Sequence, residues 1–275
     1  MKKFILLFAL AVFSFTSFAQ KKPTIKGDKN VTTITNNISK EFNAIEVDDA
    51  LVVTLIQGNQ NSYTLMADSN LQDIVQFTVK DGLLKIQTTN RITSSKKLDI
   101  MLTFKNLEYI TIKKDAELKG KERIESDILH INTHNTSKFD LEIIADEVVV
   151  TMQDKAKGKL EIRSDRTTIV MNDKTDLDAR MKTDRTTVML TKSAKLKLEG
   201  DTDKAEYKLE DSAELNAKKM KASSADLKAS NNTNVQVYVK RKLEVLARDK
   251  STIYVYGNPK IEVDKFTDKS KIINK

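Results

Sequence analysis

Short stretches in which apolar and polar residues alternate recur along most of this chain. The clearest pair is SDRTTIVM at residues 164–171 and TDRTTVML at residues 183–190, nineteen residues apart. Alternation with a period of two predicts β-strands that bury one face. Steps of nineteen residues in both directions extend the pattern into a first apolar column. That column comprises Ile112, Ile131, Val150, Ile169, Val188 and Tyr207, with Ile110, Leu129, Val148, Thr167, Thr186 and Ala205 two residues earlier.

A second apolar stretch accompanies the first in each repeat, with looser spacing. Its column comprises Leu118, Phe139, Leu160, Leu177, Leu196, Leu215, Val235, Ile253 and Ile272, and its partners two residues on include Leu141, Ile162, Ala179, Leu198, Ala217, Val237 and Val255. Small or polar segments, such as residues 172–175, 192–194 and 211–213, separate the two stretches. Asp, Asn and Ser favour turns because their side chains bond the nearby backbone. Each repeat therefore predicts two strands joined by turns.

A repeat of this kind cannot bury its own apolar face, so successive repeats must stack. Stacked strands lie ~4.8 Å apart, and about nine coils would form a rod some 40 Å long. Because crossovers between parallel strands are almost always right-handed, the sequence predicts an all-β fold, a single right-handed parallel β-helix. A leucine-rich repeat is the competing interpretation, but its pattern Leu-x-x-Leu-x-Leu-x-x-Asn is absent. An antiparallel meander would not need equivalent residues every nineteen positions.

The repeat is less regular before residue 98. Five stretches there still alternate like strands, at residues 45–47, 51–55, 63–66, 77–79 and 83–86. Asp81-Gly82 is typical of a hairpin turn. The end of a solenoid exposes unpaired backbone and needs a cap. We therefore expect an N-terminal extension at residues 20–40, irregular cap strands at 41–97, and regular coils at 98–275 that continue the same domain.

The first nineteen residues are typical of a secretory signal peptide. Two lysines precede an apolar run over residues 4–13, and Ser-Phe-Ala at residues 17–19 matches a small-x-small cleavage site. The run is shorter than the ~20 apolar residues that a spanning helix needs. Gln20 stands where a bacterial lipoprotein would need Cys. The sequence thus predicts an exported chain, in the periplasm or at the cell surface, with no lipid anchor and no transmembrane segment after cleavage.

Composition removes several classes of function. The chain has 275 residues, with no Cys, no Trp and only two His. Disulfides, thiol nucleophiles and Cys-ligated metals are therefore impossible, and we expect no cofactor. His130 and His134 lie on a strand and its following turn, where four residues span ~13 Å, so they cannot share one ion. Lys and Arg outnumber Asp and Glu by 47 to 39, but they form no dense block. Nucleic-acid binding needs a clustered positive face, so we expect none.

Several short motifs together resemble the head GIN domain, a family of auto-transporter adhesins common in secreted bacterial proteins. The motifs are FNAIEVDDALVV at residues 42–53, DGLLKI at 81–86, LDIMLT at 98–103, LEYI at 107–110, DILHI at 127–131 and DEVVV at 146–150. The resemblance covers residues 41–275. It implies a parallel β-helix in an exported, non-enzymatic protein and supplies no catalytic residues. The family's coil corners usually read Ser-Gly-Ala-Ser, whereas here Lys, Asp or Ser replaces Gly, which disfavours a corner with positive φ.

One polar position also recurs every nineteen residues. It holds Asp127, Asp146, Asp165, Asp184 and Asp203, each preceded by a small residue. In stacked coils these carboxylates would lie ~5 Å apart, where adjacent charges repel by roughly 1 kcal/mol in water. Either each Asp caps its corner by accepting backbone N–H bonds, beside Arg166, Arg185 and Lys204, or the column binds a hard cation such as calcium. We favour the structural role, because no calcium-binding repeat or EF-hand loop is present.

A second candidate site lies near the C-terminus. Burial of Val235, Val237, Ile253 and Val255 would turn three tyrosines and two basic residues outward. These residues are Tyr238, Tyr254, Tyr256, Lys240 and Arg241. Such a patch could bind a ligand, since Tyr combines contact area with a polar tip. The alternative is a cross-strand aromatic cluster that stabilises the last coils.

These features favour a non-enzymatic binding or adhesion module of the cell envelope. The repetitive faces of a solenoid suit an extended partner such as a glycan or a surface protein. One alternative is a polysaccharide-active enzyme, which would need two carboxylates ~5 to 9.5 Å apart in a cleft. The chain has no Trp, few Gly and no long insertion to wall such a cleft. The other alternative is a purely structural envelope protein.

Overall fold

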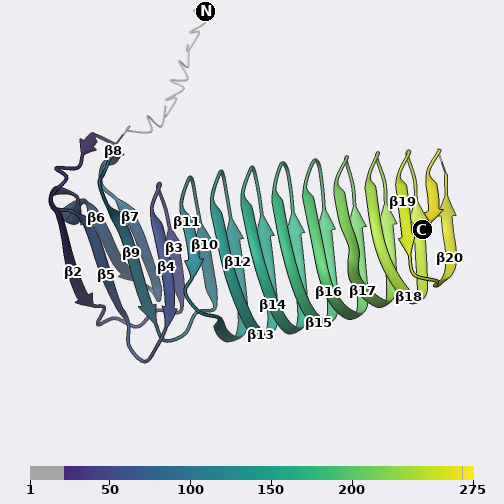
Figure 1. Ribbon diagram of the computed structural model, residues 1–275, viewed down its shortest axis with the longest axis horizontal. Coiled ribbons are helices and arrows are strands. Elements are labelled where there is room, and N and C mark those ends of the chain that lie inside the picture. Colours follow the sequence, from purple (N-terminus) through teal and green to yellow (C-terminus); the bar gives the residue numbers. More distant parts are fainter. Residues whose placement is uncertain (1–21, 268) are drawn as a thin grey trace, which may run out of the picture.

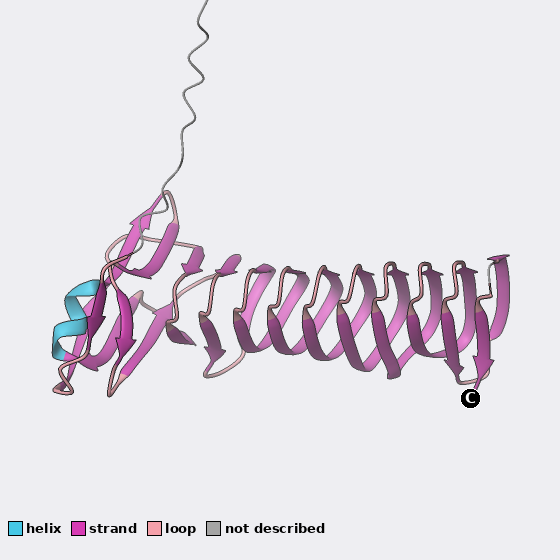
Figure 2. Ribbon diagram, turned by 90° about the horizontal axis from the view of Figure 1, so that it is seen from above, coloured by secondary structure: helices cyan, strands magenta, loops and turns pink. Residues whose placement is uncertain are grey.

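The computed structural model describes residues 22–267 and 269–275, so the predicted signal peptide at residues 1–19 lies outside the described residues. A row of similar coils extends from an irregular sheet region at the N-terminal end (Figures 1 and 2). Within the described residues the helical element is the short 3-10 helix η1 (Ser69–Ile74). No helix in that part of the chain is long and apolar enough to cross a membrane.

Each regular coil is one long strand that bends at a corner, followed by a tight turn. The strands are β12 (Ile124–Thr133), β13 (Lys138–Met152), β14 (Lys157–Met171), β15 (Asp176–Leu190), β16 (Lys195–Leu209), β17 (Glu214–Ala229) and β18 (Asn234–Ala247). Each pairs in parallel with the next, and from β13 to β16 the register advances by nineteen residues per coil. The last coils comprise β19 (Thr252–Tyr256), β20 (Lys260–Phe266) and β21 (Lys271–Asn274). The predicted parallel β-solenoid is confirmed, and its two predicted strands per coil are halves of one long strand.

The first apolar column forms a continuous spine through the core. In register order it contains Leu84, Ile45, Ile110, Ile131, Val150, Ile169, Val188, Tyr207, Leu227 and Val245. All of these residues are buried, and burying each aliphatic side chain contributes about 1.5–3 kcal/mol. The partner of Ile131 is Ile110 rather than the predicted Ile112. The prediction was wrong there because the link at residues 121–123 interrupts the strand and lengthens this coil to 21 residues.

The second column differs from the prediction at one coil. Phe139 is in register with Gly158, and Gly158 with Leu177, so Leu160 does not belong to this column. Leu160 instead lies between Leu141 and Ala179, in the position predicted for Ile162. From Phe139 to Leu215 the spacing in this column is therefore a regular nineteen residues. Gly158 is the member that an alignment of apolar residues misses.

The stack of coils begins before the regular repeat. Strands β3 (Ala44–Val47) and β4 (Val52–Gln57) follow the path of a coil, and they pair in parallel with β10 (Tyr109–Ile112) and β11 (Glu117–Gly120). On their other side they pair in parallel with β7 (Leu83–Thr88) and β9 (Leu98–Phe104). The segment between β4 and β10, residues 58–108, therefore forms the end of the rod.

This segment closes the N-terminal end of the rod with antiparallel strands. Its remaining strands are β5 (Ser62–Asp68), β6 (Val75–Lys80) and β8 (Arg91–Ser94). The five predicted strands before residue 98 are all present. The predicted hairpin joins β6 to β7 through Asp81 and Gly82, which both have positive φ. Residues of the predicted extension also join this region, since β1 (Thr24–Lys26) pairs with β8, and β2 (Val31–Asn37) pairs with β5.

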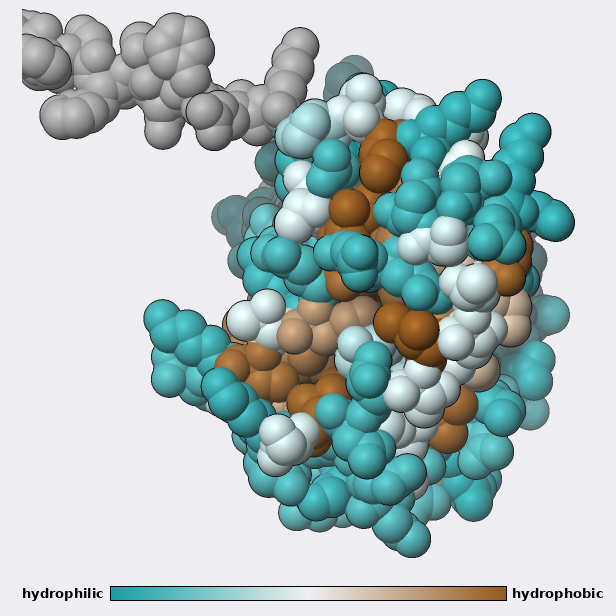
Figure 3. Space-filling view, turned by 90° about the vertical axis from the view of Figure 1, so that its left-hand side faces the viewer, coloured by the Kyte–Doolittle hydropathy of each residue, from teal (hydrophilic) through white to brown (hydrophobic). Residues whose placement is uncertain are grey.

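Apolar side chains gather on this end of the rod, where polar groups surround a hollow (Figure 3). Ile34, Tyr63, Phe77 and Val79 are only partly buried there and pack against the core. The rings of Tyr63 and Phe77 stack with centroids 3.6 Å apart, which joins β5 to β6 across the end of the interior.

A buried carboxylate holds the loops of this region together. Asp68 has no exposed surface and accepts backbone N–H bonds from Lys29, Lys96 and Lys97 at 3.0–3.1 Å. Burial by itself raises the pKa of Asp68, but these bonds hold it below its ordinary value. A Cβ at Gly27 would lie 2.0 Å from an Asp68 carboxylate oxygen, so only glycine fits beside it.

The tight turn of each coil has a left-handed residue although glycine is absent. Lys114, Asn135, Asp154, Asp173 and Lys192 have φ between 54° and 64°, so the expectation that these residues disfavour such a corner was wrong. Neighbouring coils offset the strain. The backbone N–H of Asn135 donates to Asp154 Oδ2 at 2.7 Å, and the N–H of Lys114 donates to Asn135 Oδ1 at 3.1 Å. A ladder of side-chain acceptors thus stabilises a backbone conformation that otherwise favours glycine.

Candidate functional site

The five predicted aspartates occupy the corner at which each long strand bends. All of them are exposed. Strand pairing is interrupted at this position in β13, β14 and β15, where Asp146, Asp165 and Asp184 are not in register with a residue of the neighbouring strand. The corner therefore leaves backbone groups that need other partners.

Buried hydroxyl groups one position earlier supply those partners. Thr183 Oγ1 donates to the carbonyl oxygens of Asp165 and Arg185, both at 3.1 Å. Thr202 Oγ1 makes the equivalent contacts one coil later, at 3.2 Å. Among the described residues, no hydrogen bond to the five carboxylates is observed. The prediction that the aspartates cap the corner was wrong, because the hydroxyls do so, and the carboxylates are left facing solvent.

An open groove follows this corner over four coils. Its volume is about 1230 Å³, and four of the column's aspartates line it: Asp127, Asp146, Asp165 and Asp184. Asp203 lies beyond it. We call this feature the corner groove. Its N-terminal part is lined by Glu108, which precedes β10, by Tyr109 of β10, and by Ile128 and His130 of β12.

Two stacked rings lie in the corner groove. Tyr109 and His130 are register partners on β10 and β12, and their rings stack with centroids 4.8 Å apart and planes 6° from parallel. Tyr109 is 45% exposed, and Ile128 beside it is 43% exposed. On the other side of Tyr109 the register partner is Ala44, whose methyl group covers little of the ring.

Sequence reasoning missed this pair because it assumed a constant step. A step of nineteen residues places Tyr109 opposite Ile128, two residues away from its true partner His130. The available signal was the stretch at residues 120–124, where the apolar alternation of the other coils is broken.

Charge in the corner groove is mostly negative. Six carboxylate residues line it, namely Glu108, Glu125, Asp127, Asp146, Asp165 and Asp184. Two cationic residues, Arg163 and Lys182, face them from adjacent coils. Neither cation forms an ion pair with another described residue. The groove is thus an acidic surface on a chain whose overall charge is +8.

The predicted tyrosine patch is assembled on one face of the last coils. Tyr238 and Tyr256 are register partners on β18 and β19, and Tyr254 lies two residues before Tyr256 on the same face. The valines and isoleucine of these strands are buried as predicted. The three tyrosines are half-buried. Lys275 Nζ lies 5.6 Å from the centre of the Tyr254 ring.

The two basic residues of that prediction lie at the edge of the patch. Lys240 is exposed and its Nζ lies 3.7 Å from an Asp201 carboxylate oxygen, which directs it toward the preceding coils. Arg241 is exposed. The binding role of this patch stays a prediction.

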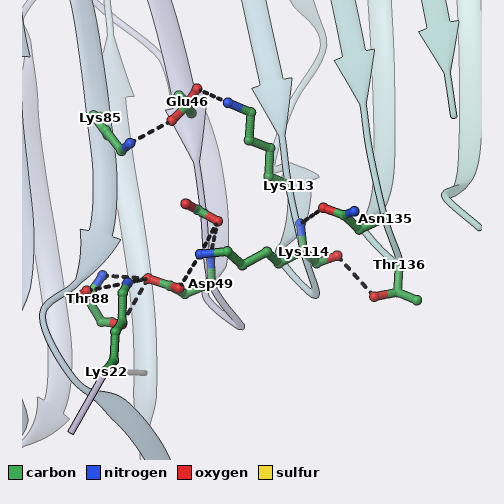
Figure 4. Close-up of polar contacts among 10 residues, drawn as sticks. Lys22, Glu46, Asp49, Lys85, Thr88, Lys113, Lys114, Asn135 and Thr136 are labelled. Carbon is green, nitrogen blue, oxygen red and sulfur yellow. Dashed lines mark hydrogen bonds and ion pairs between the residues drawn. The ribbon is translucent and has the colours of Figure 1, made fainter. Parts of the chain in front are cut away.

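A third polar group joins the N-terminal region to the first coils (Figure 4). Asp49 accepts hydrogen bonds from Lys22 Nζ at 2.5 Å, Lys114 Nζ at 2.9 Å and the Thr88 N–H at 2.9 Å. Burial raises the pKa of Asp49, but the two ammonium groups and Thr88 outweigh it and hold the pKa well below its ordinary range. Glu46 similarly lies between Lys85 and Lys113. These contacts connect four separate segments, so the cluster is a structural one.

The part of the chain that the structure describes contains no preformed metal-binding site. No group of three or more His, Asp or Glu side chains there could hold a metal ion. His130 faces Tyr109, whereas His134 follows the end of β12.

Comparisons with known proteins give a family and a fold. A family model described as "Putative auto-transporter adhesin, head GIN domain" matches residues 41–161 and 153–259. A crystal structure described as a putative adhesin from Parabacteroides merdae is 15% identical, with a TM-score of 0.65 over 92% of this chain and 99% of that one. One described as a putative lipid binding protein from Parabacteroides distasonis is 19% identical, with a TM-score of 0.64 over 91% and 99%. A putative adhesin from the same species is 17% identical, with a TM-score of 0.58 over 91% and 99%.

At these identities the likeness shows the fold alone. A search of curated proteins gave no match.

Proposed function

Because this chain belongs to the head GIN domain family, whose description is "putative auto-transporter adhesin", we propose that it is an exported, non-enzymatic binding module of the bacterial cell envelope. Its ligand is an extended molecule, such as a glycan or a surface protein, that lies along several coils. Family membership supports export, and the periplasm or the cell surface is the proposed location.

The observation that carries this proposal is the corner groove on a stack of coils in constant register. From β13 to β16 equivalent residues recur every nineteen positions, which places equivalent surface groups ~4.8 Å apart along the rod. A groove over four coils presents the same groups repeatedly. Such a surface suits a ligand that is itself elongated and repetitive.

Catalysis on a polysaccharide is the weaker alternative. A glycoside hydrolase needs one carboxyl group held away from water as the general acid, opposite a second that acts as base or nucleophile. The aspartates of the corner groove are all exposed and lie in one row on the same side. That arrangement supplies neither the opposed pair nor the environment that makes one member an acid.

The test is a binding measurement combined with a turnover measurement. The purified chain is labelled and applied to a glycan array and to a panel of immobilised envelope proteins, and new reducing ends are measured after incubation with each bound glycan. We expect saturable binding to at least one target and no new reducing ends. Turnover would contradict the non-enzymatic role, and the absence of saturable binding would favour the purely structural alternative.

A further inference from the structure

We propose that the corner groove binds uncharged glycan chains, with the face of the Tyr109 ring that His130 leaves open as the platform for one sugar ring. This inference rests on the binding role proposed above and specifies its ligand class. The acidic row at the corner acts as an excluding surface that rejects anionic glycans.

The platform has the geometry that carbohydrate recognition needs. Sugar rings present a face of C–H groups, and aromatic rings with a polar tip offer a matching flat surface. Tyr109 is nearly half exposed although it is held rigidly between two coils. The stacked ring of His130 fixes the orientation of Tyr109 on one side. The small Ala44 on the other side leaves room for a ligand.

The backbone around Tyr109 is held rigidly, which supports its role as a platform for a sugar ring. Backbone pairing holds Tyr109 from both sides, because β10 lies between β3 and β12. Ser126 Oγ donates to the Leu107 and Ile128 carbonyl oxygens, at 2.9 Å and 3.0 Å, and fixes the floor of the groove beside the rings. A preorganised surface loses little side-chain freedom when a ligand binds.

Charge then selects among glycans. Carboxylate oxygens accept hydrogen bonds from sugar hydroxyl groups, but they repel the carboxylate or sulfate groups of acidic polysaccharides. Six acidic residues against two cationic ones line the groove. An uncharged chain can run from the platform along the row of aspartates, with its hydroxyl groups as donors. A uronate chain of equal length would bring a negative charge to each coil.

Isothermal titration calorimetry with defined hexasaccharides tests the inference. The probes are cellohexaose, chitohexaose and mannohexaose as uncharged chains, and hexagalacturonate as the anionic chain. We expect at least one uncharged probe to bind at least tenfold more tightly than hexagalacturonate. Equal or tighter binding of hexagalacturonate, or binding of none of the uncharged probes, would overturn the inference.

Variants locate the site. Tyr109→Ala should weaken binding of the uncharged probe at least tenfold, whereas Tyr109→Phe should keep most of it because the ring remains. Phe266→Ala, which removes an exposed aromatic ring on β20 outside both candidate sites, is the matched control and should leave binding unchanged. The thermal midpoint of each variant reports whether the coils are intact. Unchanged binding by a folded Tyr109→Ala variant would overturn the site.

Failure here differs from failure of the proposed function. If the chain binds an envelope protein on the panel but none of these hexasaccharides, the binding role stands and the glycan site falls.

Discussion

The ring of Phe139 occupies the space into which a side chain at Gly158 would project. These residues are register partners on β13 and β14, and a Cβ at Gly158 would lie 2.1 Å from Phe139 Cζ. The large ring of Phe139 therefore fills the space that Gly158, which has no side chain, leaves in the same layer of the core. This compensation keeps the backbone register constant where the apolar pattern of the sequence becomes irregular.

Substitution at Gly158 should show that this position depends on the space that Phe139 occupies. Gly158→Leu overfills the layer and should lower the free energy of unfolding by about 1–3 kcal/mol. In the double variant Phe139→Ala with Gly158→Leu, the new side chain occupies the vacated space. Chemical denaturation measures the free energy of unfolding of the parent, the two single variants and the double variant. The double variant should be more stable than the sum of the two single effects predicts. Additive effects would show that the two side chains do not share one space.

The inward and outward faces of a coil can be compared at adjacent residues. Leu190 has no exposed surface, whereas Met189 is 41% exposed. Leu190→Ala should cost about 2–5 kcal/mol of unfolding free energy, because it leaves a cavity between coils. Met189→Ala should change that free energy by less than about 0.5 kcal/mol. Urea titrations of both variants measure the difference, and similar losses would mean that the alternation is assigned to the wrong face.

The corner hydroxyl groups make a separate prediction. Thr183→Val keeps the shape of the side chain but leaves two carbonyl oxygens without their donor. It should lower the free energy of unfolding by about 0.5–3 kcal/mol. Thr187→Val on the outward side of the same strand is the control and should be close to neutral. If Thr183→Val is as stable as the parent, backbone groups or water must satisfy the corner instead.

Acid should weaken the contacts of Asp49. Its pKa is lower in the folded protein than in the unfolded chain, so its contribution is fully present above the unfolded pKa of about 3.9. That contribution is lost as the pH falls through the lower, folded pKa. Asp49→Asn should therefore be less stable than the parent at pH 7, and the difference should shrink between pH 5 and pH 2. A difference that stays constant over this pH range for Asp49→Asn would contradict the ion-pair account.

The repeat and the inward columns could be predicted from the sequence, because a buried strand face requires strict alternation. The two halves of each strand from β12 to β16 obey that rule except at Gly158, and Ile131, Val150, Ile169 and Val188 stack as the spacing predicts. The errors lie where something other than alternation decides the register. An extra link at residues 121–123 shifted Ile110 into the column, and Gly158 replaced an apolar residue that the pattern requires.

For the candidate sites too, some features could be predicted from the sequence and others could not. The outward tyrosines follow directly from burial of their neighbours, so Tyr238 and Tyr256 could be placed together. The Tyr109–His130 platform depends on a coil of 21 residues, which no constant step reveals. The roles at the corner also depend on hydrogen bonds across coils, and sequence spacing does not distinguish the hydroxyl of Thr183 from the carboxylate of Asp184 as the capping group.

Disulfide trapping tests the coil register most directly, because the chain has no cysteine of its own. Val149 and Thr168 are outward-facing register partners, and Val170 lies two residues further along the same strand. Partners on adjacent coils lie ~4.8 Å apart, within the Cα separation of about 4.4–6.8 Å that a disulfide spans. Under mild oxidation the double variant Val149→Cys with Thr168→Cys should form an intramolecular disulfide, and Val149→Cys with Val170→Cys should not. Preferential trapping of the second pair would contradict the register on which the core, the corner groove and the stacked rings all depend.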